Sequence, residues 1–95
     1  MEFDWDEGNR HKNLRHGVHD WEIEEAFGGD SSTRPAASHS RFEEERFVIF
    51  GRARTSGKYL RIVYTVREIG GHRFIRPISA VEMRQREKRR YRRRQ

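Results

Sequence analysis

Arginine is the residue type on which the clearest chemistry of this sequence depends. A guanidinium group presents a planar fork of N–H donors that binds phosphate through two hydrogen bonds, and it can stabilise charge that develops on a phosphate during transfer. Composition leaves open an alternative, a solvated polar face in which the arginines pair with Glu43–Glu45 and Glu68. Six arginines lie on or beside the segments predicted below to be strands: Arg52, Arg54, Arg61, Arg67, Arg73 and Arg76.

The sequence offers little for other kinds of catalysis. It contains no cysteine and no Gly-x-Ser-x-Gly turn, which argues against the common nucleophilic mechanisms. His16 and His19 have a spacing that suits a metal ion on a continuous helix, but Gly17 is expected to end the helix between them. The pairs Gly28-Gly29 and Gly70-Gly71 are interpreted as a helix stop and a hairpin turn, not as phosphate-binding loops. We therefore expect no metal site and no cofactor.

Charge is distributed unevenly along the chain. Residues 1–45 carry a net charge of −7, residues 46–83 carry +6 and residues 84–95 carry +7, within a total of +6. This asymmetry predicts a polyanionic partner for the basic half, with salt-dependent attraction from the tail. The alternative is that the acidic and basic halves partly neutralise each other in the fold.

The first part of the sequence predicts a helix after a short extended segment. Glu2–Trp5 is a candidate edge strand, and Asp6 is expected to cap a helix over Glu7–Arg15. Gly17 is well placed to end that helix in a left-handed conformation. The segment has few apolar residues, so Trp5 and Leu14 are expected to anchor it to the sheet.

A second helix and a loop are expected to follow. Asp20 is the next candidate cap, and apolar residues at helical spacing predict an amphipathic helix over Trp21–Phe27. Asp30–Ser40 is rich in serine, alanine and proline and is interpreted as a loop.

The centre of the sequence predicts an antiparallel meander. Arg46–Arg54, Tyr59–Arg67 and His72–Ala80 are rich in β-branched and aromatic residues and are separated by short glycine-containing turns. Proline cannot donate a ladder hydrogen bond, so Pro77 is expected at an edge strand or a bulge.

Alternation within the second strand separates apolar from basic side chains. Arg61 and Arg67 are expected on one face. Helix-favouring residues over Glu82–Arg94 predict a basic C-terminal helix, although residues 84–95 could also be a frayed tail. The opposite, packed face of the strand would carry Leu60, Ile62, Tyr64 and Val66.

These elements predict one α+β domain over residues 1–95. It would consist of a small antiparallel sheet of three main strands, with the N-terminal segment as a fourth, short edge strand, two N-terminal helices and the basic C-terminal helix. No apolar run is long enough to span a bilayer and no signal-peptide pattern is present. We expect a cytoplasmic protein that has no contact with a membrane.

Several short motifs occur in an order that resembles the BrnT toxin family. They are FDWDEGN and KNLRHGV near the start, then EEAF, ERFVIFGRA, YLRIVYTVRE, RPISA and a terminal E..RY. The resemblance extends from Phe3 to about Tyr91. It implies a fold like that of RelE-type ribonuclease toxins and a type II toxin–antitoxin system in the bacterial cytoplasm. The implied partners are RNA and a cognate BrnA-like antitoxin with a ribbon-helix-helix domain, through which the complex would bind operator DNA.

The resemblance also implies a metal-independent endoribonuclease without a nucleophilic side chain. The 2′-hydroxyl of the RNA attacks the adjacent phosphate, while the protein positions the strand and neutralises the transition state. The implied catalytic residues are Arg67, Arg73, Arg76 and His16, the last as a general acid or base. The implied RNA-binding residues are Lys12, Arg15, Arg52, Arg54 and Arg61, with Tyr64 or Tyr91 stacking on a base.

Two points keep a second interpretation open. Many family members continue the ISA motif with arginine, whereas this chain has Val81. His16 could simply interact with the C-terminal dipole of its helix. The protein could therefore be a weakly active or inactive member that serves as a binding module for an antitoxin or for nucleic acid.

Overall fold

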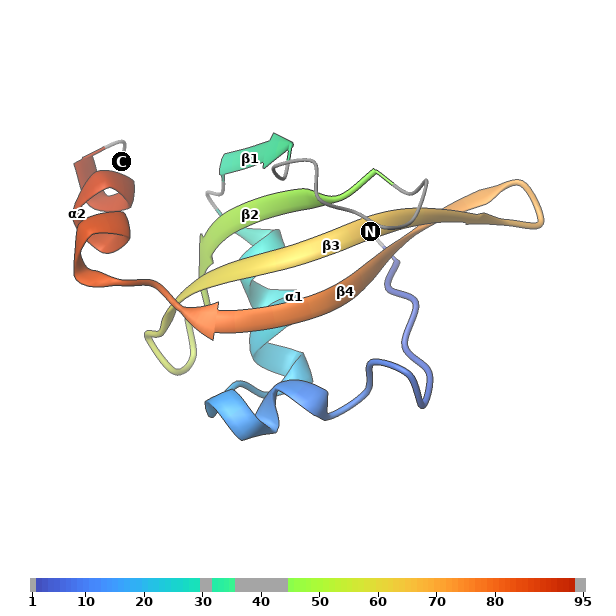
Figure 1. Cartoon of the computed structure of the whole chain (residues 1–95), viewed down its shortest axis with the longest axis horizontal. Coiled ribbons are helices and arrows are strands. Elements are labelled where there is room, and N and C mark those ends of the chain that lie inside the picture. The colour runs from blue at the N-terminus through green and yellow to red at the C-terminus, as the bar shows by residue number, and fades with distance from the viewer. Residues whose placement is uncertain (1, 30–31, 36–44, 94–95) are drawn as a thin grey trace.

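The computed structural model describes residues 2–29, 32–35 and 45–93, with the backbone alone described for residues 32–35. Figure 1 shows the strands as one twisted sheet, with α1 across one face and α2 at one end. The predicted α+β class is confirmed. In chain order the elements are a 3-10 helix η1 (Lys12–His16), helix α1 (Asp20–Gly28), strands β1 (Ser32–Pro35), β2 (Phe47–Arg52), β3 (Tyr59–Ile69) and β4 (His72–Glu82), and helix α2 (Gln85–Arg93).

The sheet is antiparallel throughout, and its strands are neighbours in sequence order, β1-β2-β3-β4. The meander predicted for the last three strands is therefore confirmed. Gly70 and Gly71 join β3 to β4 with φ angles of 59° and 82°, a left-handed backbone that glycine adopts without steric cost. Because this turn matches the right-handed twist of the strands, the longest hairpin of the sheet closes tightly.

The interpretation of residues 30–40 as a loop is wrong for part of that segment. Ser32–Pro35 forms β1, whose four residues pair with Phe47–Phe50 of β2. A proline is tolerated there because β1 is an edge strand. The local composition favours a loop, and the strand forms only because β2 supplies a partner from a distant part of the sequence. The rest of the predicted loop lies outside the described residues.

Pro77 lies where the sequence predicted, in an edge strand and beside a bulge. It pairs with Tyr64, whereas Val63 pairs with Ser79, so Ile78 is left without a cross-strand partner. The extra residue shifts the register within β4. Residues on the hairpin side of the bulge therefore alternate with the opposite phase from those nearer α2.

The core forms where α1 packs on one face of the sheet. The predicted alternation in β3 is confirmed for Leu60, Ile62 and Tyr64, which are buried, whereas Val66 is exposed. Gly51 of β2 allows a close approach of the helix, since a Cβ atom there would lie 2.4 Å from the backbone oxygen of Ala26. The buried residues packed in this layer are Val18, Ile23, Ala26, Phe27, Ile49, Ala53, Leu60, Ile62, Tyr64 and Ala80.

The predicted helix over Glu7–Arg15 is wrong. Turns occupy residues 7–11, and only Lys12–His16 forms a single 3-10 segment, η1. The Asp6 carboxylate accepts a hydrogen bond from the Gly8 N–H at 2.7 Å, which makes a local turn and not the cap of an α-helix. Gly17 ends η1 at φ 73°, as predicted.

Two asparagines, not Leu14, anchor this N-terminal segment. Leu14 is exposed, whereas Asn9 and Asn13 are buried. The Asn9 amide donates to the backbone oxygen of Pro77 at 3.0 Å, and the Asn13 side-chain oxygen accepts from the Ala80 N–H at 2.9 Å. These bonds satisfy backbone groups on the outer edge of β4 that no strand pairs. The polar composition of the N-terminal segment is therefore explained by the backbone groups of β4 that it binds.

The first residues extend the same edge. Phe3 forms an isolated parallel bridge with Ile75, and the Asp4 N–H donates to the Ile75 oxygen at 2.8 Å. The predicted edge strand is thus reduced to one bridge. Phe3 and Trp5 pack against the core, and the Trp5 indole donates to Glu24 of α1 at 2.8 Å.

Both α-helices begin one or more residues away from the predicted position. The cap of α1 is His19, not Asp20, because the Glu22 carboxylate accepts the His19 N–H at 2.9 Å. Helix α2 begins at Gln85, since Glu82 still belongs to β4. Neither helix, and no other in the described ranges, is long and apolar enough to cross a membrane.

Candidate functional site

The β3–β4 hairpin brings two of the predicted arginines together. Arg76 lies directly opposite Thr65, and Arg67 lies opposite Phe74, so both arginines share the face away from α1. They also share a carboxylate: Asp4 lies 3.1 Å from the Arg76 guanidinium and 3.5 Å from that of Arg67. The parallel bridge at Phe3 explains this position, because it places the next residue, Asp4, over the same face.

Arg76 is the centre of an ion-pair network. Its two terminal nitrogens donate to the two carboxylate oxygens of Asp6, each at 3.0 Å, and one also donates to Asp4 at 3.1 Å. The Arg76 hydrogen bonds, and after them the hydrogen bond from the Gly8 N–H, hold the pKa of Asp6 below its ordinary value. In turn, the hydrogen bonds to the Asp6 carboxylate raise the pKa of Arg76. With 17% of its side chain exposed, Arg76 mainly holds the N-terminal segment.

The other hairpin arginine is more exposed and weakly paired. Arg73 lies directly opposite Glu68, and its guanidinium is 3.6 Å from that carboxylate, with 79% of the Arg73 side chain exposed. A pair in this setting contributes little to stability because water screens it. The hairpin arginines, defined as Arg67, Arg73 and Arg76, thus each have an acidic partner.

The structure does not place the predicted residues of the N-terminal segment beside the hairpin arginines. Lys12, Arg15 and His16 are exposed on η1, which is bound to β4 through the Asn13–Ala80 hydrogen bond. Ala80 lies four residues beyond Arg76, or roughly 13 Å along a strand. His16 and Arg76 are therefore parts of two separate basic areas.

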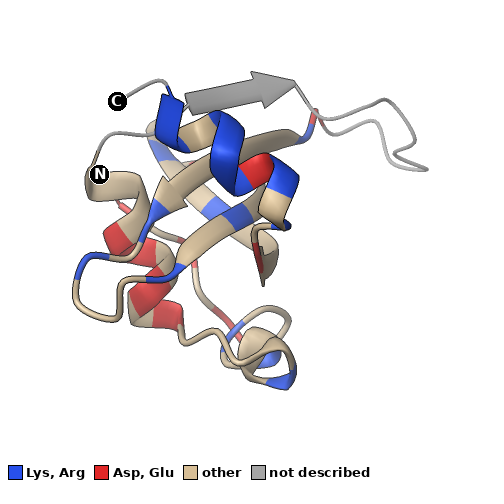
Figure 2. Cartoon of the chain, turned by 90° about the vertical axis from the view of Figure 1, so that its left-hand side faces the viewer, with Lys and Arg blue, Asp and Glu red and all other residues tan. Residues whose placement is uncertain are grey.

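A second basic group surrounds Tyr59 at the other end of β3. The Arg52 guanidinium lies 5.2 Å from the centre of the Tyr59 ring, the Lys88 ammonium 4.8 Å and the Arg92 guanidinium 6.0 Å. These are cation–π distances. We call Arg52, Tyr59, Lys88 and Arg92 the Tyr59 cluster. Figure 2 shows lysine and arginine gathered on α2 and on the adjoining strand ends, while α1 carries acidic residues.

Sequence reasoning identified Arg52 but missed the other three members. Lys88 and Arg92 are four residues apart and so share one side of α2. The sequence alone shows this spacing and could have indicated a shared basic surface. Their approach to Tyr59 depends on the tertiary contact between α2 and β3. Two predicted residues lie outside the cluster: Arg61 is 3.7 Å from Glu87, and the Arg54 side chain lies over Gly29 at the end of α1.

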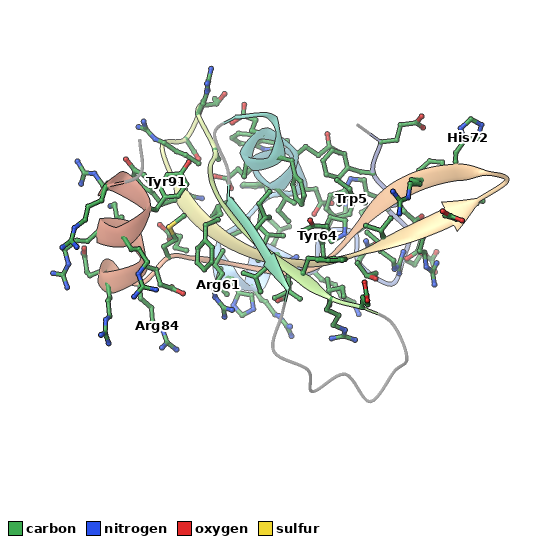
Figure 3. All side chains as sticks on the ribbon, turned by 90° about the horizontal axis from the view of Figure 1, so that it is seen from above. Trp5, Arg61, Tyr64, His72, Arg84 and Tyr91 are labelled. Atoms are coloured by element: carbon green, nitrogen blue, oxygen red, sulfur yellow. The ribbon has the colours of Figure 1, made fainter. Side chains whose placement is uncertain are left out.

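Both tyrosines predicted to stack on a base are buried. Tyr64 is 8% exposed and packs edge-on against Phe27, with ring centres 5.0 Å apart. Tyr91 is 7% exposed and meets the Tyr59 ring edge-on at 5.8 Å. Figure 3 shows Tyr91 between α2 and the strands. Both rings pack in the interior of the protein. Their burial argues against the predicted stacking of either ring on a base.

Within residues 2–29 and 45–93, no group of three or more histidine, cysteine, aspartate or glutamate side chains is arranged to hold a metal ion. His16 and His19 lie on either side of Gly17, where the left-handed backbone separates η1 from the start of α1.

Comparison with known proteins identifies the family. A search of curated proteins finds no match. The family model described as "Ribonuclease toxin, BrnT, of type II toxin-antitoxin system" matches residues 5–87, which include most of the N-terminal segment, the core and the hairpin arginines, and which end before Lys88 and Arg92. The chain therefore belongs to the BrnT family of ribonuclease toxins of type II toxin–antitoxin systems.

Proposed function

We propose that this protein is an endoribonuclease toxin that cleaves RNA and is neutralised by a cognate antitoxin. The observation that carries the proposal is the family match over residues 5–87. Membership of a type II system entails a protein antitoxin and, for a ribonuclease toxin, an RNA substrate. The proposal extends to a RelE-like fold, action in the cytoplasm and a BrnA-like antitoxin, whose ribbon-helix-helix domain would carry the complex to operator DNA.

The proposed reaction uses the RNA as its own nucleophile. The 2′-hydroxyl attacks the adjacent phosphorus, the bond to the 5′-oxygen breaks, and a 2′,3′-cyclic phosphate and a 5′-hydroxyl result. The protein has to bind the phosphate, offset its growing negative charge, take one proton from the 2′-hydroxyl and give one to the leaving oxygen. Arginine supplies the charge, which agrees with the many arginines on the strands.

The geometry suggests different roles for the predicted catalytic residues. Arg67 is 46% exposed and shares a face with Arg76, so we assign it the contact with the scissile phosphate. Arg76 is a positioning residue, because its donors already bind Asp4 and Asp6. Arg73 is an outer phosphate contact. The predicted acid–base residue His16 lies with Lys12 and Arg15 on the separate η1 surface, beyond hydrogen-bond reach of a phosphate held by Arg67, so we assign all three to RNA binding.

Induced expression in a bacterial host tests the proposal. We expect growth arrest and RNA decay with the natural sequence, and loss of both with Arg67→Ala. That substitution removes one partly exposed ion pair, so the variant should fold, which its thermal midpoint would check. Arg10→Ala, an exposed arginine outside the proposed site, is the matched control and should remain toxic. Normal growth and intact RNA with the natural sequence would contradict the proposal.

One observation favours a non-catalytic binding module as the second candidate. Val81, at a position where the family resemblance implies an arginine, pairs with Arg61 on the face away from α1. An arginine there would add a charge beside Arg61. If the natural protein leaves RNA intact, binds its antitoxin normally and gains cleavage on Val81→Arg, the second candidate is correct.

A further inference from the structure

The Tyr59 cluster differs from the hairpin arginines because no acidic partner is found for it in the part of the chain that the structure describes. Within the described residues, no carboxylate lies within ion-pair distance of Arg52, Lys88 or Arg92, although all three approach one ring. The nearest acid along α2 is Glu87, which is engaged by Arg61 at 3.7 Å and by the Arg84 N–H at 2.9 Å. Three cations held together with no described acid beside them repel one another, and an anionic ligand would relieve that repulsion.

The cluster is held in place by contacts that do not involve its charges. Arg52 and Tyr59 are direct cross-strand partners at the ends of β2 and β3. The Met83 N–H donates to the Tyr59 backbone oxygen at 2.8 Å, and Tyr91 packs edge-on against the Tyr59 ring. These contacts fix the start and one side of α2 against β3. The cations are therefore positioned before any ligand arrives.

The arrangement suits phosphates better than bases. A base would have to stack on the Tyr59 ring, but cations already occupy positions over that ring. Guanidinium and ammonium groups bind phosphate oxygens directly. Tyr59 then acts as the support that orients the cations. The Tyr59 cluster is also eight residues along β3 from Arg67, roughly 26 Å at the rise of a strand.

We propose that the Tyr59 cluster is a phosphate-binding site for the backbone of a single-stranded nucleic acid, separate from the residues that cleave it. The inference rests on the proposed function in taking RNA as the natural ligand. It adds a second contact area, by which α2 holds the strand several nucleotides away from the scissile phosphate. In this arrangement α2 contributes through specific residues and not only through its total charge.

The test is the affinity of the full chain for a fluorescent single-stranded DNA oligonucleotide, measured by anisotropy across salt concentrations. This probe lacks the 2′-hydroxyl and is not cleaved, so the result does not depend on catalysis. We expect Lys88→Gln/Arg92→Gln to lower the affinity roughly tenfold at low salt and to reduce the salt slope by about 0.7 for each phosphate that the variant no longer neutralises. Thermal unfolding of each variant verifies its fold.

The matched control is Arg86→Gln/Arg90→Gln. These two arginines are exposed, have the same four-residue spacing, and lie about 200° around the helix from Lys88 and Arg92. The control removes the same charge, so we expect a clearly smaller loss of affinity. Equal losses in the two double variants would overturn the proposal, because they would show attraction to the overall charge of α2.

Tyr59 supplies a second, charge-neutral test. Tyr59→Leu removes the ring that orients the cations and should weaken binding without a change in net charge, whereas Tyr59→Phe should bind normally. Unchanged oligonucleotide affinity in Lys88→Gln/Arg92→Gln, together with weakened antitoxin binding, would overturn the proposal in favour of an acidic protein surface. If RNA cleavage fails but this pattern holds, the proposed function falls and the phosphate site stands.

Discussion

The hairpin arginines and the Tyr59 cluster both consist mainly of basic side chains, but these side chains lie in opposite electrostatic surroundings. Around Arg76, two carboxylates reach a guanidinium that is largely covered, and the charges cancel within the fold. Around Tyr59, three cations share one aromatic ring and no described carboxylate pairs with them. The difference teaches that a covered arginine with two carboxylate partners, such as Arg76, serves the fold, whereas exposed cations with a weak partner or none described can still bind a ligand. The predictions below test whether the ion pairs of Arg76 stabilise the fold and the Tyr59 cluster does not.

The largest effect on stability is expected at Asn9, because its side chain binds the backbone of Asp4 and Asp6, the acidic partners of Arg76. Asn9 accepts the Asp6 N–H at 2.8 Å and donates to the backbone oxygens of Asp4 and Pro77 at 2.9 and 3.0 Å. Asn9→Ala should lower the free energy of unfolding by about 3 kcal/mol, because buried polar groups lose their partners. Urea denaturation measures this change. The exposed neighbour variant Arg10→Ala should be close to neutral, and equal effects would contradict the account.

Removal of the central cation should have the next largest effect. Arg76→Ala leaves Asp4 and Asp6 close together without their shared partner, and we expect a loss of about 2 kcal/mol in the free energy of unfolding. The contrast is Arg73→Ala, whose exposed pair with Glu68 should contribute less than about 0.5 kcal/mol. If urea denaturation shows the two variants to be equally stable, Arg76 is not the structural centre of the hairpin network.

A smaller effect is expected from pH. The pKa of Asp6 is lowered in the folded protein, first by the Arg76 hydrogen bonds, so folding favours the ionised carboxylate. Its contribution is present above the unfolded pKa, near 3.9, and is lost as the pH falls through the folded pKa. Asp6→Asn should therefore lose less thermal stability than the natural protein between about pH 5 and pH 2. An equal fall in thermal stability of the variant and the natural protein over this pH range would contradict the assigned role of Asp6.

The smallest effect should come from the Tyr59 cluster itself. Lys88→Gln removes one cation–π contact but also relieves repulsion from Arg52 and Arg92, so the free energy of unfolding should change by less than about 0.5 kcal/mol. Thermal unfolding at low salt gives the most sensitive comparison with the natural protein. A loss comparable to that of Arg76→Ala would remove the distinction between the two groups.

Local sequence signals predicted the elements well where the chain determines its own conformation. Alternation located β3 and β4, Gly70-Gly71 predicted their turn, and helical spacing of Ile23, Ala26 and Phe27 predicted α1. The failures are segments whose conformation depends on a distant partner. β1 needs β2, and the N-terminal segment takes its turns because Asn9 and Asn13 bind the edge of β4.

The candidate site was predictable only as a collection of residue types. The motifs identified the family, and the resemblance made Arg67 and Arg76 candidates. The pairing of Arg76 with Asp6 spans 70 residues, and no local spacing indicates it. Likewise, nothing in the sequence around Tyr64 or Tyr91 distinguishes a ring available for stacking from one packed in the interior, because their burial depends on α1 and β3.

By itself, the sequence determined the class of the fold, the family, the charge gradient and the abundance of arginine on the strands. Only the tertiary structure decided which arginines are neutralised and which remain available for a ligand. The physical reason is that local structure follows from backbone preferences and short-range periodicity, whereas the electrostatic state of a charge depends on distances in space. Asp4 and Asp6 reach Arg76, and Lys88 and Arg92 reach Tyr59, only after the chain has folded.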